Sequence, residues 1–137
     1  MSELMNKELL IKLGLKERDF KVLNYVIDTI NKNIKNNKEN YDKLETIYIY
    51  GSKVKNLSTF SSDIDIAIIS SENIKNIDKF NIYFDLSNYD MKYKKEKLPE
   101  LDSHIYYSLN FKENKSIYIN DIKNEGVIIW EKTITEE

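Results

Sequence analysis

The stretch that decides the fold is Tyr50–Asp65, YGSKVKNLSTFSSDID. Gly51 and Ser52 end one apolar run, and ten residues later Asp63 and Asp65 open the next. The i, i+2 spacing of the aspartates places both carboxylates on one face of a strand, about 7 Å apart at Cα. Carboxylate oxygens are the ligands that hard divalent cations prefer, and two such cations can clamp the oxygens of a phosphoryl transfer.

The Gly-Ser turn supplies the complementary part of such a site. Gly51 lets the backbone approach a phosphate closely, and Ser52 offers a hydroxyl and an N–H where a helix is expected to begin. Taken singly, Asp63 and Asp65 fit solvated strand residues and Ser52 fits a helix cap. The turn and the aspartates at this spacing together favour cation and phosphate binding.

The segments on either side predict a sheet domain. β-branched and aromatic residues, or strict alternation, predict strands at residues 45–50, 63–70, 80–87 and 127–130.

Helical patterns separate these strands. An apolar stripe predicts a helix over residues 16–35, and shorter helices are expected at 2–13 and 72–79. Another is expected to start at Pro99, where apolar residues follow at i, i+4 and i+8 (Leu101, Ile105 and Leu109). Residues 115–124 fit either a helix or a strand. The order predicts one α/β or α+β domain over residues 1–137, with helices in 1–40 and the sheet region in 45–131.

Composition limits the chemistry that this chain can perform. It has 137 residues, no cysteine and one histidine, His104, which excludes thiol catalysis and a multi-histidine metal site within the chain. His104 stands alone and is expected to be structural. The 21 basic and 23 acidic residues give a net charge of −2, which argues against a dedicated nucleic-acid binder. No apolar run resembles a signal peptide or a membrane span, so we expect a cytoplasmic protein without a membrane partner.

The motif Gly51, Ser52, Asp63, Asp65 resembles the signature of the DNA polymerase β-type nucleotidyltransferase superfamily. The chain is most similar to the minimal nucleotidyltransferases, many of which are antitoxins paired with a HEPN-domain toxin. The resemblance implies a mixed sheet flanked by helices. It also implies two Mg²⁺ ions on the aspartates and ATP as substrate. Its candidate nucleotide-binding residues are Gly51, Ser52, Lys53 and Ser62.

The resemblance also implies a third metal carboxylate with a catalytic role. The segment FDLSNYD is similar to the family strand that carries it, which favours Asp85. Asp102 lies nearer the usual separation along the chain but follows Pro99 on an expected helix, so it stays the alternative. Lys53 occupies a position where the family often has arginine, and it can meet a triphosphate or simply be a surface lysine.

Three functions fit these features. The first is transfer of AMP from ATP to a hydroxyl, such as that of a tyrosine, on a HEPN-type ribonuclease toxin. The short chain leaves little surface for a bulky small-molecule site, so we expect a second protein to shape the acceptor side. The alternatives are nucleotidylation of a small molecule such as an antibiotic, and a non-catalytic antitoxin or binding module on the same fold. The sequence does not define the oligomeric state.

Overall fold

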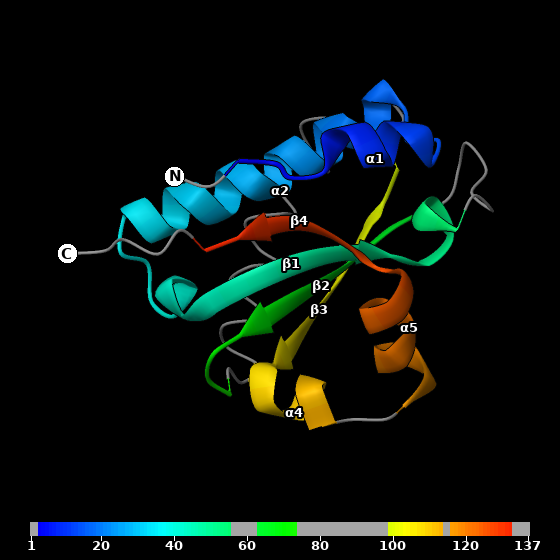
Figure 1. Cartoon of the computed structure of the whole chain (residues 1–137). Helices are drawn as coiled ribbons and strands as arrows, with labels where there is room; N and C mark the ends of the chain where they lie inside the picture. Colours follow the sequence, from blue (N-terminus) through cyan, green and yellow to red (C-terminus); the bar gives the residue numbers. More distant parts are fainter. Residues whose placement is uncertain (1–2, 56–62, 74–98, 114–115, 133–137) are drawn as a thin grey trace.

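The computed structural model describes residues 3–55, 63–73, 99–113 and 116–132, which form a four-stranded sheet with helices on both faces (Figure 1). The helices are α1 (Lys7–Lys12), α2 (Glu17–Lys35), α4 (Ser108–Glu113) and α5 (Ile117–Glu125), with short 3-10 turns η1 (Tyr41–Lys43) and η2 (Gly51–Val54). The strands are β1 (Leu44–Tyr50), β2 (Ile64–Ser70), β3 (Leu101–Tyr107) and β4 (Val127–Glu131).

The sheet is mixed, as expected, with the strand order β3-β2-β1-β4. β1 runs antiparallel to β2 and β4, whereas β2 and β3 are parallel. The register pairs Tyr50 with Asp65 across β1 and β2, and Asp65 with Asp102 across β2 and β3. The end of β1 and the starts of β2 and β3 therefore lie side by side at one end of the sheet.

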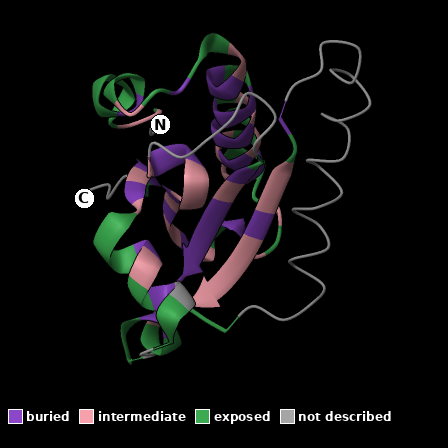
Figure 2. Cartoon of the chain, turned by 90° about the vertical axis from the view of Figure 1, so that its right-hand side faces the viewer, coloured by how far each residue is buried: buried purple, intermediate pink, exposed green. Residues whose placement is uncertain are grey.

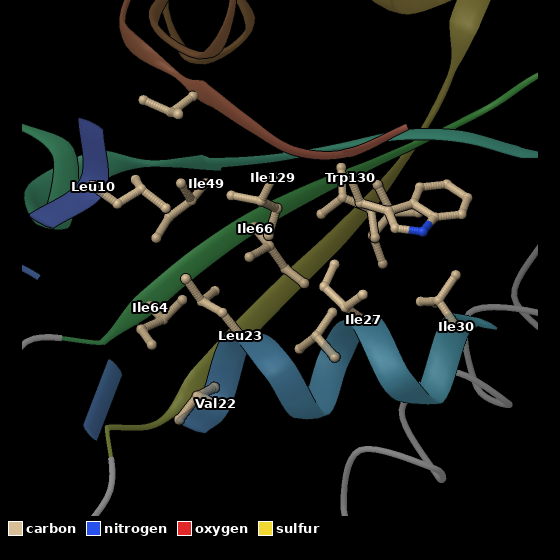
Figure 3. Close-up of a cluster of buried hydrophobic side chains, with 14 of the residues drawn as sticks. Leu10, Val22, Leu23, Ile27, Ile30, Ile49, Ile64, Ile66, Ile129 and Trp130 are labelled. Atoms are coloured by element: carbon tan, nitrogen blue, oxygen red, sulfur yellow. The ribbon is translucent and has the colours of Figure 1, made fainter. Parts of the chain in front are cut away.

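One face of the sheet packs on α2 through an aliphatic core (Figure 3). The apolar stripe predicted for residues 16–35 is confirmed, with Leu23, Ile27 and Ile30 buried against the sheet. Ile66 meets them from β2, and Trp130 closes the core while its indole N–H donates to Asn31 Oδ1 at 3.1 Å. Because apolar burial is the main favourable term in folding, this face carries most of the stability.

The opposite face packs on α4 and α5 through a smaller cluster that includes Ala67, Ile69 and Ile122. Three partly buried tyrosines border this cluster, namely Tyr48, Tyr50 and Tyr106. Figure 2 shows that β3 is mostly half-buried, whereas β2 beside it is buried almost throughout. The side of the sheet near β3 is therefore the more accessible one.

The strands predicted at 45–50, 63–70 and 127–130 are confirmed, and the ambiguous segment 115–124 is mostly the helix α5. The helix predicted at 2–13 spans only Lys7–Lys12. The Met5 N–H donates to Ile129 O at 2.8 Å, and the Asn6 side chain donates to Ile128 O at 2.7 Å. These bonds tie the segment before the helix to β4. The elements predicted at 72–79 and 80–87 lie almost wholly outside the described residues.

The helix predicted from Pro99 is wrong, because residues 101–107 form the strand β3. Leu101 and Ile105 are four residues apart, a spacing that satisfies the period of a strand as well as that of a helix. Both pack against the aliphatic core, and Ser103 between them is buried. Pairing with β2 supplies the backbone hydrogen bonds, so tertiary context outweighs the local helical signals.

Among the described residues, no helix combines the length and apolar character needed to cross a membrane.

Candidate active site

The Gly-Ser turn leaves β1 directly beside the carboxylate of Asp65. Gly51 has φ +77°, a left-handed conformation that side chains rarely adopt. A Cβ added at Gly51 would lie 2.7 Å from Asp65 Oδ2, closer than real Cβ contacts allow. The positive φ therefore favours glycine here, and any other residue would also force the Asp65 carboxylate to move.

The two aspartates of the motif lie at the start of β2. Asp63 is exposed just before the strand, and Asp65 is half-buried within it. Ile64 and Ile66 point into the aliphatic core (Figure 3). Because successive strand residues alternate between faces, Asp65 lies on the opposite face, which packs on α4 and α5 further along β2.

Asp102 brings a third carboxylate to the same place. It pairs in register with Asp65 on the parallel strand β3. The pKa of Asp65 is raised from its ordinary value, first by burial and then by the negative charges of Asp102 and Asp63, although His104 acts in the opposite direction. Asp102 and Asp63 are thus close enough for their charges to disfavour ionisation of Asp65.

Three residues that the sequence did not mark as functional surround this carboxylate group. His104 Nε2 lies 3.3 Å from Asp102 Oδ2, with the two side chains 43% and 48% exposed. The pKa of the Tyr50 hydroxyl is raised first by burial and then by Tyr106, Asp65 and Asp102. His104 also contacts the Tyr106 ring, with centroids 6.5 Å apart.

A sequence signal for these residues did exist. Asp102, His104 and Tyr106 follow each other at every second position, which places them on one face of a strand. The helix assignment for this segment hid that alternation. His104, expected to stand alone, in fact contacts the carboxylate of Asp102.

Lys53 does not face this group, and the expectation of a surface lysine is wrong. Its side chain is 3% exposed and its ammonium lies 3.0 Å from Asp19 Oδ1 on α2. Ser52 is half-buried within η2, a turn of four residues. Ser62 and Asp85 lie outside the described residues.

The donor set fits a hard divalent cation in its chemistry. Asp63, Asp65 and Asp102 lie at the same end of the sheet, and a cation there would offset the charges that disfavour ionisation of Asp65. Among the described residues, however, the structure shows no group of three or more His, Cys, Asp or Glu side chains placed closely enough to hold a metal ion.

A family model for the polymerase beta nucleotidyltransferase domain matches residues 32–134. The chain belongs to this family. The match contains the Gly-Ser turn and both aspartates of the motif, so the resemblance expected from the sequence is confirmed, as is the fold. No curated protein sequence matches the chain significantly.

Solved structures with the same fold include a protein from Sulfolobus solfataricus described as a nucleotidyltransferase. It is 19% identical, with a TM-score of 0.53 and 93% of each chain covered. A chain of a toxin–antitoxin complex with AMP-PNP is 21% identical, with a TM-score of 0.47, covering 75% of this chain and 73% of that one. A chain from a tri-AMPylated Shewanella oneidensis HEPN toxin in complex with an MNT antitoxin is 21% identical, with a TM-score of 0.43, covering 78% and 73%.

Proposed function

We propose that this nucleotidyltransferase moves AMP from ATP to a hydroxyl group of a partner protein, with divalent cations held by Asp63, Asp65 and Asp102. One observation carries the proposal. The turn that would receive the phosphates touches the carboxylate that would hold the cation, through the 2.7 Å approach of Asp65 Oδ2 to the vacant Cβ position of Gly51. Nucleotidyl transfer needs these two parts side by side.

Each residue then has a distinct task. The bare backbone at Gly51 admits the triphosphate, and the Ser52 hydroxyl and N–H bind its terminal phosphates. Asp63 and Asp65 would hold Mg²⁺, which would supply positive charge to offset that of the phosphates. The acceptor oxygen bonds to the α-phosphorus as the bond to the bridging oxygen breaks and pyrophosphate leaves. Asp102 receives the proton of the acceptor hydroxyl.

Asp102 replaces Asp85 as our choice for the third carboxylate. The in-register pairing of Asp65 with Asp102 supports this choice, and the helix assignment that favoured Asp85 is wrong. Asp102→Asn should lower the rate of transfer about 100-fold, whereas Asp85→Asn should leave it within about twofold of the unchanged protein. The opposite result would return the role to Asp85.

The acceptor is proposed from the resemblance of the motif to minimal nucleotidyltransferases. It would be a tyrosine or other hydroxyl of a HEPN-type toxin, and the reaction would take place in the cytoplasm. Purified protein is incubated with ATP labelled at the α-phosphate, Mg²⁺ and the product of the neighbouring gene. We expect label on that partner, no label without Mg²⁺, and none with Asp65→Asn.

Two other outcomes would contradict the proposal. Label on an aminoglycoside with none on the protein partner would indicate a small-molecule enzyme. Neutralisation of the partner that persists undiminished in Asp65→Asn would indicate a non-catalytic binding module.

A further inference from the structure

The Gly-Ser turn is tied to α2 by a buried ion pair that spans two distant parts of the chain. Lys53 directly follows Ser52, and Asp19 lies in the first turn of α2. The Lys53 ammonium is 3.0 Å from Asp19 Oδ1, and each side chain is only 3% exposed. Two charges removed from water in this way need each other, because either one left alone would be a buried unpaired charge.

Asp19 is itself fixed by the helix that carries it. Its second carboxylate oxygen, Oδ2, accepts the backbone N–H of Lys16 at 2.8 Å, which satisfies a free donor at the start of α2. The apolar stripe of α2 is in turn packed on the sheet. Asp19 is therefore a rigid anchor, and Lys53 attaches the turn to it.

A second lysine in the same region provides a contrast. Lys55 pairs with Asp121 at 2.7 Å and with Glu125 at 3.2 Å on α5. These side chains are between about a third and half exposed, so water and salt screen the pairs and they hold the turn weakly. The attachment to α2 is buried and the attachment to α5 is not.

We propose that Asp19 and Lys53 are positioning residues that hold Ser52 and the backbone of Gly51–Val54 in the conformation that receives the triphosphate. The inference rests on the proposed function for its consequence in catalysis. It assigns Lys53 a role different from a phosphate ligand, because its ammonium is buried against α2. The phosphate contacts then come from Ser52 and the backbone that the ion pair orients.

The decisive variant removes both charges together. Asp19→Asn with Lys53→Met leaves no unpaired buried charge, and the asparagine keeps an oxygen that can accept the Lys16 N–H. Replacing a whole buried ion pair by neutral groups is often tolerated by the fold. Lys53→Arg keeps the charge and serves as the rescue variant, and Lys55→Met is the matched control on the exposed pair.

Hydrogen exchange tests the anchoring itself without any nucleotide. In the double variant, the amides of Gly51–Lys55 should exchange about tenfold faster, while those of Ile64–Ser70 keep their rates. Lys53→Arg and Lys55→Met should exchange like the unchanged protein. Unchanged exchange of the turn in the folded double variant would overturn the inference, whatever the protein does with ATP.

Nucleotide binding tests the consequence. The Kd for ATP with Mg²⁺, measured by calorimetry, should rise about tenfold in Asp19→Asn, in Lys53→Met and in the double variant alike, because all three break one pair. The transfer rate at saturating ATP should change much less. If Lys53 bound phosphate directly, Asp19→Asn would free its ammonium and leave the Kd unchanged or lower, which would overturn the inference. Absence of any ATP binding by the unchanged protein would instead count against the proposed function, while the exchange data still decide the anchoring.

Discussion

The two faces of the sheet are built from the same strands, but only one of them carries the carboxylates of Asp65 and Asp102. On β2, Ile64, Ile66 and Ile68 all enter the aliphatic core under α2. On the other face, Asp65 precedes Ala67 and Ile69, which pack beneath α4 and α5. Neighbouring residues on one strand thus belong to separate environments, one that stabilises the fold and one that carries the carboxylates. This arrangement predicts that stability and activity can be altered separately.

The largest effect should come from the carboxylate face. Asp65→Asn should lower the rate of AMP transfer about 1,000-fold or more, because it removes a proposed cation ligand. The melting temperature should stay the same or rise, since the change relieves repulsion with Asp102 and Asp63. Asp28→Asn, on the exposed side of α2, is the matched control and should behave like the unchanged protein. Transfer above a tenth of the normal rate in Asp65→Asn would contradict the assignment.

Ile66, the residue after Asp65, should affect stability and leave the transfer rate nearly unchanged. Ile66 is fully buried in the aliphatic core, so Ile66→Ala should lower the free energy of unfolding by about 2–5 kcal/mol in urea titrations. Ile66→Val should cost about 0.5–1.5 kcal/mol. The transfer rate per folded molecule should remain close to normal below the unfolding transition. A rate that falls in proportion to the size of the cavity would show that the two faces are not independent.

Gly51 contributes both to stability and to the position of the Asp65 carboxylate. Its substitution should therefore lower the transfer rate less than Asp65→Asn does, and lower stability less than Ile66→Ala does. Gly51→Ala should cost about 1–2 kcal/mol of stability through the positive φ, and it should also displace Asp65, lowering the transfer rate roughly tenfold. Gly14, after α1, also has a positive φ, of 103°. Gly14→Ala should therefore lose comparable stability, measured by thermal unfolding, with no loss of transfer rate. If Gly51→Ala and Gly14→Ala lost equal activity, the effect at Gly51 would come from backbone strain alone and not from displacement of Asp65.

The smallest effect is expected at His104. Its contact with Asp102 is at 3.3 Å, and both side chains are nearly half exposed, so the pair is well screened. His104→Ala should lower the transfer rate by less than about tenfold and leave the melting temperature unchanged. A loss of transfer rate as large as that of Asp102→Asn would make His104 a member of the catalytic group. The candidate active site would then extend further along β3.

Local patterns were sufficient to predict a large part of the fold and to name candidate residues for the site. β1, β2, β4 and α2 were predicted because their apolar periodicity is a property of each segment alone. The Gly-Ser turn and the aspartates at the start of β2 were found for the same reason, since their spacing is contained in one short stretch. Ser62 and Asp85 lie outside the described residues, so the placement of Ser62 in the site stays a prediction, and Asp102 is proposed in place of Asp85.

Segment 99–109 shows where such reasoning failed. Pro99 and an i, i+4 repeat favour a helix locally, but the backbone of Leu101–Tyr107 pairs with β2 instead. The alternation of Asp102, His104 and Tyr106 fits a strand equally well, but β2, the partner that decides between strand and helix, is distant in the sequence. A helix there would separate Asp102 from the aspartates of β2, whereas the strand places Asp102 in register with Asp65 and His104 on the same face.

The sequence by itself determined the kind of chemistry available to this protein. The lack of cysteine and the single histidine left carboxylates, and the motif identified Asp63 and Asp65 and the family. Only the tertiary structure decided that Asp102 lies beside Asp65 and that Lys53 is buried against Asp19. The physical reason is that both contacts join residues far apart in the chain. Such contacts depend on strand pairing and on the packing of α2, which no local pattern encodes.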